Sequence, residues 1–138
     1  MILRIKNRRV ERLYGGRIRQ IAKLYGQDWR DLLAQVVVES GGNAKALSSS
    51  GAIGLMQIKP IVLKEIKRKK INLFHPWENL WAGEKYLEVL RDRYGYETLY
   101  EQLVAYHDGP SKARRFLSRN LPSEHFYVQR FIAVRAAM

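Results

Sequence analysis

The sequence predicts an all-α fold, and three observations support this prediction. Apolar residues recur at spacings of three and four in several segments, which places them along one face of a helix. Glycine or proline borders most of these segments, where such residues end or start helices. The chain has 138 residues, 46% of them hydrophobic, which suffices for one core and is too short for two ordinary domains. We therefore expect one compact helical domain.

The first 16 residues are predicted to form a basic N-terminal segment, separate from a globular domain over residues 17–138. In this segment, apolar residues such as Ile2 alternate with cations such as Arg4. The pattern fits either a short basic helix or a flexible arm. It would act as an electrostatic tether, with a solvated chain terminus as the plainer alternative.

The domain is predicted to begin with two helices, over residues 17–25 and 29–39. Gly26 closes the first, and Asp28 is well placed to cap the second. A pair of glycines, beginning at Gly41, ends the second helix. Three consecutive valines in this helix also suit a buried strand, so the apolar pattern alone leaves helix and strand open.

Four further helices are expected in the second half of the chain. Asn79 is a plausible N-terminal cap for the second of them, and Gly83, in its middle, indicates close packing against a neighbour because glycine there costs stability. The segment His107 to Pro110 reads as a helix stop and turn. The expected ranges are 60–70, 79–94, 98–106 and 123–136.

The charge of the chain is strongly positive: 25 Lys and Arg against 13 Asp and Glu give a net charge of +12. Such a protein is attracted to polyanions, whether nucleic acid, anionic lipid headgroups or the acidic polymers of a bacterial envelope. The densest cationic run, residues 67–70, lacks interleaved aromatic residues that would stack on bases. We therefore expect a solvated helix face there and no specific nucleic-acid partner.

Several other functions are not expected. The chain has no cysteine, which excludes disulfides and thiolate catalysis. Its three histidines are widely spaced, so no metal site is expected, and the histidines are predicted to lie in loops or at the surface. No segment is apolar enough for a membrane span, and the N-terminus lacks the apolar run of ~7 to 15 residues that a signal peptide needs.

Glu39 is the strongest candidate for a catalytic residue. It ends an apolar helix, where the helix dipole and an apolar neighbourhood both raise the pKa of a carboxyl. A raised pKa keeps a proton available near neutral pH, as a general acid requires. The loop that follows contains Gly51 and Gly54, which let backbone approach a ligand, and Gln57, a neutral donor and acceptor. The plainer alternative is a solvated surface glutamate beside core valines.

Four ordered motifs between residues 32 and 131 are similar to those of a known family. They are Glu39-Ser40 with Ser48 and Gly51-Ala52-x-Gly54-Leu55-Met56-Gln57-x-x-Pro60, then Asn79-Leu80-x-x-Gly83-x-x-Tyr86-Leu87, then Ala105-Tyr106-x-x-Gly109-Pro110, and last Tyr127-Val128. In residue type and order they resemble the soluble lytic transglycosylases, bacterial enzymes with a lysozyme-like fold that cut the glycan of peptidoglycan. The resemblance implies a compact lysozyme-like domain with a substrate cleft, and it favours helix over strand for residues 29–39.

The resemblance also implies roles for individual residues. Glu39 would be the catalytic acid and Ser40 its structural partner, with Tyr106 beside the acid. This chain departs from the family pattern at His107 and Asp108, where asparagine and alanine are usual, which puts substrate preference and pH optimum in doubt. The substrate-binding residues would be Ser48, Gly54, Leu55, Met56, Gln57, Tyr106, His107 and Tyr127.

The implied reaction cleaves the β-1,4 bond between N-acetylmuramic acid and N-acetylglucosamine and leaves a 1,6-anhydro end, with Glu39 as acid and then base. Two alternatives remain: a hydrolase of lysozyme or chitinase type, using Glu39 and Asp108, and a non-catalytic cationic module that binds cell wall or nucleic acid. The expected partners are peptidoglycan strands and anionic envelope polymers. A monomer in the bacterial envelope or periplasm, or associated with a phage, is expected.

Overall fold

The structure is all helical, as the sequence predicts. The computed structural model describes residues 1–138 and contains no β-strand; two isolated bridges join Leu47, Ile53 and Ile58 within one loop. None of its helices is long and apolar enough to cross a membrane. In chain order the elements are α1 Ile2–Leu24, α2 Trp29–Ser40, α3 Val62–Glu65, α4 Pro76–Asp92, α5 Leu99–Asp108, α6 Pro110–Leu117, the 3₁₀ turn η1 Pro122–Glu124 and α7 Phe126–Ala136.

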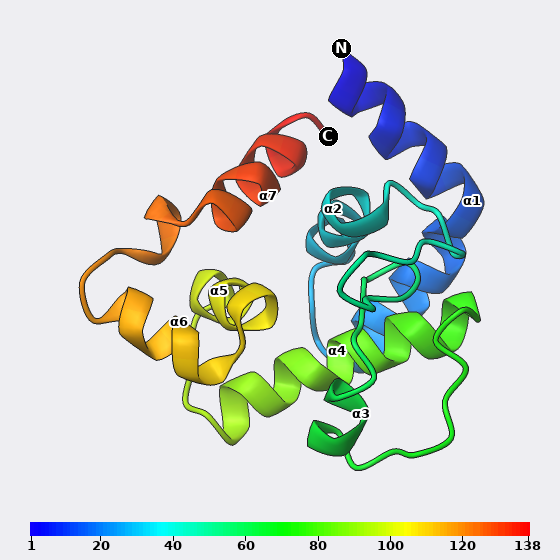
Figure 1. The fold of residues 1–138 in the computed structure, drawn as a ribbon. Helices are drawn as coiled ribbons and strands as arrows, with labels where there is room; N and C mark the ends of the chain where they lie inside the picture. Colours follow the sequence, from blue (N-terminus) through cyan, green and yellow to red (C-terminus); the bar gives the residue numbers. More distant parts are fainter.

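Helix α2 lies at the centre of the molecule, in contact with α1 and α7 (Figure 1). Asp28 caps its start by accepting a hydrogen bond from the Arg30 backbone N–H at 2.9 Å. Residues 32–37 are all buried, and they include two of the three valines that left strand and helix open. Because so much of α2 is covered by other helices, its C-terminal end is held firmly within the fold.

Helix α1 runs without a break through the predicted boundary between residues 16 and 17. Its first half is packed rather than free: Val10 is fully buried, and the Asn7 side-chain amide donates to the Val134 carbonyl of α7 at 3.0 Å. The two termini accordingly lie on the same side of the molecule (Figure 1). Residues 2–16 are thus helical, and their separate function stays a prediction.

The helix predicted over residues 60–70 is much shorter in the structure, where α3 has four residues. Ile66 and Leu73 are both buried, and the segment between them crosses the surface without regular structure. Lys67 takes the left-handed conformation (φ 57°), which ends the helix, and four neighbouring cations disfavour its continuation. The prediction failed because burial of two apolar anchors decides the path of this segment.

Two boundaries near the C-terminus also differ from the prediction. The last helix begins at Phe126 rather than near residue 123, after the η1 turn. Pro110 starts the unpredicted helix α6, since proline suits the first position of a helix as well as the turn before it. This helix supports the C-terminal end of α5.

Asn79 is not a helix cap, because α4 begins three residues before it, at Pro76, with His75 as the cap. Its side chain is fully buried and instead holds the loop of residues 51–57, which we call the glycine loop. The amide donates to the carbonyls of Leu73 at 2.7 Å and Ile53 at 2.8 Å, and its oxygen accepts from the Met56 backbone N–H at 2.8 Å. One side chain therefore joins the loop that contains Ile53 and Met56 to the backbone at Leu73.

Gly83 marks a close contact, as the sequence predicts. A Cβ atom at this position would overlap the end of the buried Met56 side chain, so glycine lets this side chain lie directly on α4. Asn79 and Gly83, one turn apart on α4, thus both hold the glycine loop against this helix.

Candidate active site

Glu39 projects from the C-terminal end of α2 into a cleft of about 500 Å³. Gly41 caps the helix in the left-handed conformation (φ 61°), as its sequence position predicts. The cleft is walled by the glycine loop on one side and by the end of α5 on the other. Its lining includes Glu39, Ser48, Gln57, Tyr106, His107 and Asp108.

The Glu39 carboxyl stays partly protonated near neutral pH. Burial raises its pKa to about 7, and this outweighs two opposing effects. Those effects are a hydrogen bond that the Tyr127 hydroxyl donates to Oε2 at 2.6 Å, and the positive charge of Arg130. The group therefore retains a transferable proton while facing a cleft, as a general acid must.

A second buried carboxyl shows that burial alone does not identify the catalytic group. Burial and the charge of Asp31 raise the pKa of Glu84 to about 8. Glu84, however, lies in a separate cavity of about 230 Å³, where the side-chain amide of Gln27 faces it. Only Glu39 combines a raised pKa with the large cleft.

Two tyrosines lie near Glu39, and their hydroxyls have different hydrogen-bond partners. Tyr127, buried in α7, bonds the carboxyl directly. The Tyr106 hydroxyl donates to the Met56 carbonyl at 2.8 Å, so it ties α5 to the glycine loop. The hydroxyl that contacts the acid is therefore that of Tyr127, and Tyr106 contributes its ring to the cleft wall.

Ser40 fastens the end of α2 to the glycine loop, the structural role expected of it. Its hydroxyl donates to the Leu55 carbonyl at 2.7 Å and accepts from the Gly42 backbone N–H at 3.1 Å. The end of α2 that carries Glu39 is therefore tied directly to the loop.

Of the four loop residues expected to bind substrate, Gly54 to Gln57, the structure places only one at the cleft. Leu55 and Met56 are fully buried in the core, so their side chains hold the loop and do not line the cleft. Gly54 (φ 76°) lies against Asn79, and a Cβ there would overlap the Asn79 amide. Of the four, only Gln57 lines the cleft, with its amide donating to the Gly54 carbonyl at 3.1 Å.

Ser48 lies at the wall of the cleft. Its hydroxyl accepts from the Ala52 backbone N–H at 2.9 Å and lies 3.1 Å from the Ser50 hydroxyl. Local backbone bonding thus fixes Ser48 while leaving it beside the space where a ligand would lie.

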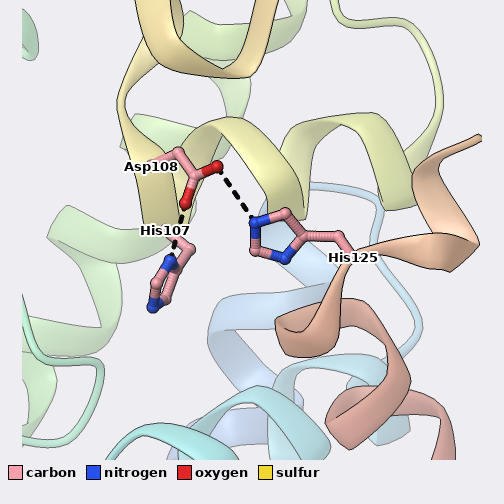
Figure 2. Close-up of side chains that lie close together, drawn as sticks. All are labelled: His107, Asp108 and His125. Atoms are coloured by element: carbon pink, nitrogen blue, oxygen red, sulfur yellow. Dashed lines mark hydrogen bonds and ion pairs between the residues drawn. The ribbon is translucent and has the colours of Figure 1, made fainter. Parts of the chain in front are cut away.

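His107 and Asp108 meet a third residue that the sequence did not single out, His125 (Figure 2). The Asp108 carboxylate lies between the two imidazoles, 2.9 Å from His107 Nδ1 and 3.0 Å from His125 Nε2. Of the loop or surface positions predicted for the histidines, His125 has the first: it lies in the bend between η1 and α7, but it is only 4% exposed. Seventeen residues separate Asp108 from His125, and no local spacing signals their contact.

Asp108 is the only other carboxyl that lines the cleft. Burial raises its pKa, but the hydrogen bonds from both histidines reverse this effect and leave the pKa lower than usual. Because its two oxygens already accept bonds from His107 and His125, Asp108 is poorly suited to act as a second catalytic base.

We expect Tyr127→Phe to move the loss of catalytic activity at alkaline pH to a higher pH. The lost hydrogen bond favours the charged form of Glu39, so its removal raises the pKa of Glu39 above about 7. Activity that requires the protonated acid falls as pH rises through this pKa, and that fall should occur at higher pH in the variant. The profile of kcat/KM against pH measures the shift, with Tyr100→Phe as the surface control; an unmoved alkaline limb would contradict this role for Tyr127.

A family comparison identifies relatives of this chain. The family model described as Transglycosylase SLT domain matches residues 17–125. Membrane-bound lytic murein transglycosylase E of Buchnera aphidicola is 34% identical over 118 residues, which are 75% of this chain and 56% of the relative. A transglycosylase of Enterobacteria phage PRD1 is 36% identical over 89 residues, 64% of this chain and 32% of the relative. The chain thus spans about half or less of the length of these relatives.

A solved structure shares the fold. The 70 kDa soluble lytic transglycosylase from Escherichia coli superposes with a TM-score of 0.75 at 24% identity, over 90% of this chain and 24% of that one. This similarity confirms the lysozyme-like architecture that the motifs predicted.

Proposed function

The chain belongs to the Transglycosylase SLT domain family, and on that premise we propose that it is a lytic transglycosylase acting on peptidoglycan. The observation that carries the proposal is the single protonated carboxyl of Glu39 at the wall of a large cleft. Relatives named as lytic murein transglycosylases support the same activity.

The proposed reaction uses Glu39 twice. Its carboxyl first protonates the oxygen of the β-1,4 bond between N-acetylmuramic acid and N-acetylglucosamine, and the bond breaks. The N-acetyl group of the substrate stabilises the positive anomeric carbon. The Glu39 carboxylate then takes the proton of the muramoyl C6 hydroxyl, whose oxygen attacks that carbon and forms the 1,6-anhydro ring. A pKa of about 7 suits a group that must give and then regain a proton at neutral pH.

A hydrolase is the main rival, and the geometry favours it less. Hydrolysis by the usual glycosidase mechanisms needs a second carboxylate as nucleophile or base. In this cleft that role falls to Asp108, whose oxygens are taken by His107 and His125. A single acid with an internal hydroxyl nucleophile needs no such partner, and it needs no metal ion or organic cofactor.

The products of a peptidoglycan digest test the proposal. We expect muropeptides with 1,6-anhydro ends, which are lighter than hydrolysed products by one water, when purified cell walls are digested and analysed by mass spectrometry. Products with reducing ends only would identify a hydrolase. Absence of any cleavage, with wall binding retained, would identify a binding module.

The positive surface supports an envelope setting. A net charge of +12 should hold the protein near anionic wall polymers, and salt should weaken that binding. We propose that residues 17–138 form the catalytic domain and that the first 16 residues add to this attraction. Location in the bacterial envelope or on a phage, in line with the membrane-bound and phage relatives, belongs to the same proposal.

A further inference from the structure

The contact between His107, Asp108 and His125 fixes where the protons of both imidazoles lie. The His125 Nδ1 atom accepts a hydrogen bond from the Tyr127 backbone N–H at 3.1 Å, so it carries no proton. Its Nε2 must then carry the proton and donate it to Asp108 Oδ2, 3.0 Å away. This arrangement belongs to the start of α7, where His125 is the N-terminal cap.

Asp108 also determines which nitrogen of His107 carries the proton. An ionised Asp108 can only accept, so His107 Nδ1, 2.9 Å from Oδ1, carries the proton in the neutral ring. Its Nε2 then bears a lone pair and has no hydrogen-bond partner within the protein. The His107 side chain is 37% exposed and lines the cleft with Glu39, whereas that of Asp108 is 6% exposed.

Neighbouring rings hold His107 in this orientation. Its ring centroid lies 4.9 Å from that of Phe126 and 5.0 Å from that of Tyr127, the residue that bonds Glu39. Figure 2 shows the three side chains with the carboxylate between the imidazoles. The free nitrogen of His107 therefore lies in the same cleft as Glu39, on a ring packed between aromatic neighbours.

This geometry fits a chain of hydrogen bonds from His125 through Asp108 to His107 better than it fits a metal site. The carboxylate occupies the space between the two nitrogens, which is where a shared ion would lie. For His125 Nε2 to bind a metal ion, its proton would have to move to Nδ1, and the bond from the Tyr127 N–H would be lost.

We propose that Asp108 and His125 are positioning residues that hold His107 in the Nδ1–H form, so that its Nε2 accepts a hydrogen bond from a glycan hydroxyl in the cleft. The nature of the ligand rests on the proposed function; the form of the imidazole does not. The proposal gives a reason for the two residues at which this chain departs from the family pattern, since a histidine replacing asparagine needs a neighbour that fixes its acceptor nitrogen.

Long-range ¹H–¹⁵N NMR tests the first half of the proposal. The chain has only three histidines, so His75→Gln, His107→Gln and His125→Gln assign every signal. At a pH where the rings are neutral, we expect Nδ1–H for His107 and Nε2–H for His125. In Asp108→Asn the amide donates on one side, and His107 should shift toward the Nε2–H form, while Asp92→Asn at the surface leaves both unchanged. Nε2–H for His107 in the unmodified protein would overturn the proposal, as would binding of micromolar Zn²⁺ by these residues.

Kinetics on soluble glycan fragments test the second half. Asp108→Asn is expected to raise KM roughly tenfold, the value of one hydrogen bond, with a much smaller change in kcat. In a His107→Asn background the same change should have no further effect, because Asp108 acts through His107. An equal rise in KM in that background would show a merely structural role. If the unmodified protein cleaves no peptidoglycan but its histidines show the expected forms, the proposed function is wrong, whereas the positioning of His107 by Asp108 and His125 is confirmed.

Discussion

Glu39→Gln is expected to reduce lysis of purified cell walls by roughly 10²–10⁴-fold, the usual contribution of a general acid. Glutamine keeps the shape of the side chain and can still accept a bond from the Tyr127 hydroxyl, but it has no proton to transfer. The loss of turbidity of a wall suspension measures the rate, and co-sedimentation with the walls measures binding, which should be retained.

A matched control for this variant is Glu84→Gln. It replaces the other carboxyl whose burial raises its pKa, in a cavity away from the cleft. We expect it to keep normal lytic activity. Unchanged lysis by Glu39→Gln would remove Glu39 from its catalytic role, and equal losses in both variants would point to a general effect on the fold.

Asn79→Ala is expected to cause the largest loss of stability among single changes near the cleft. It removes three hydrogen bonds of a fully buried side chain and leaves the Met56 N–H and the carbonyls of Ile53 and Leu73 without that partner. The Ile53 carbonyl still accepts from the Ile58 backbone N–H at 2.9 Å, so two of the three groups lose their only partner. Unsatisfied buried groups cost about 1–3 kcal/mol each, so we expect a loss of at least about 2 kcal/mol and a fall in Tm of roughly 7 °C. Thermal unfolding followed by circular dichroism measures this fall.

The control for Asn79 is Asn120→Ala, which removes a single bond to the Phe116 carbonyl at a partly buried position. It should cost about 1 kcal/mol or less and leave lysis unchanged. Below its Tm, Asn79→Ala should also lose activity, because the loop that Ser40 ties to α2 is no longer held in place. Equal stability losses for the two asparagines would contradict the central role of Asn79 in the loop.

Local signals account for the parts of the fold and site that the sequence predicts well. The capped apolar helix ended by glycine places Glu39 at the end of α2, and Gly83 marks a close contact. Both signals are read from spacing and backbone preference within a few residues, although the side chain that Gly83 contacts, Met56, is distant in the sequence. The family motifs added Ser40 and Tyr127 by resemblance.

The features that the sequence missed depend on contacts between distant segments. Asn79 looks like a cap locally, but its amide satisfies backbone groups up to 26 residues away. The Tyr127 hydroxyl reaches Glu39 across 88 residues, and His125 meets Asp108 across 17. The short α3 has the same origin, since buried Ile66 and Leu73 override the helical pattern around them. Such pairings need the assembled fold, which single-sequence patterns do not contain.

A ¹³C NMR titration of the side-chain carboxyls tests the central claim most directly. Glu39 should titrate near pH 7, and its signal is identified by its absence from Glu39→Gln, which separates it from the signal of Glu84 near pH 8. An acid that is still protonated at neutral pH can donate to a glycosidic oxygen. A Glu39 carboxyl that titrates near the ordinary value of 4.5 would be charged under those conditions and would contradict the mechanism.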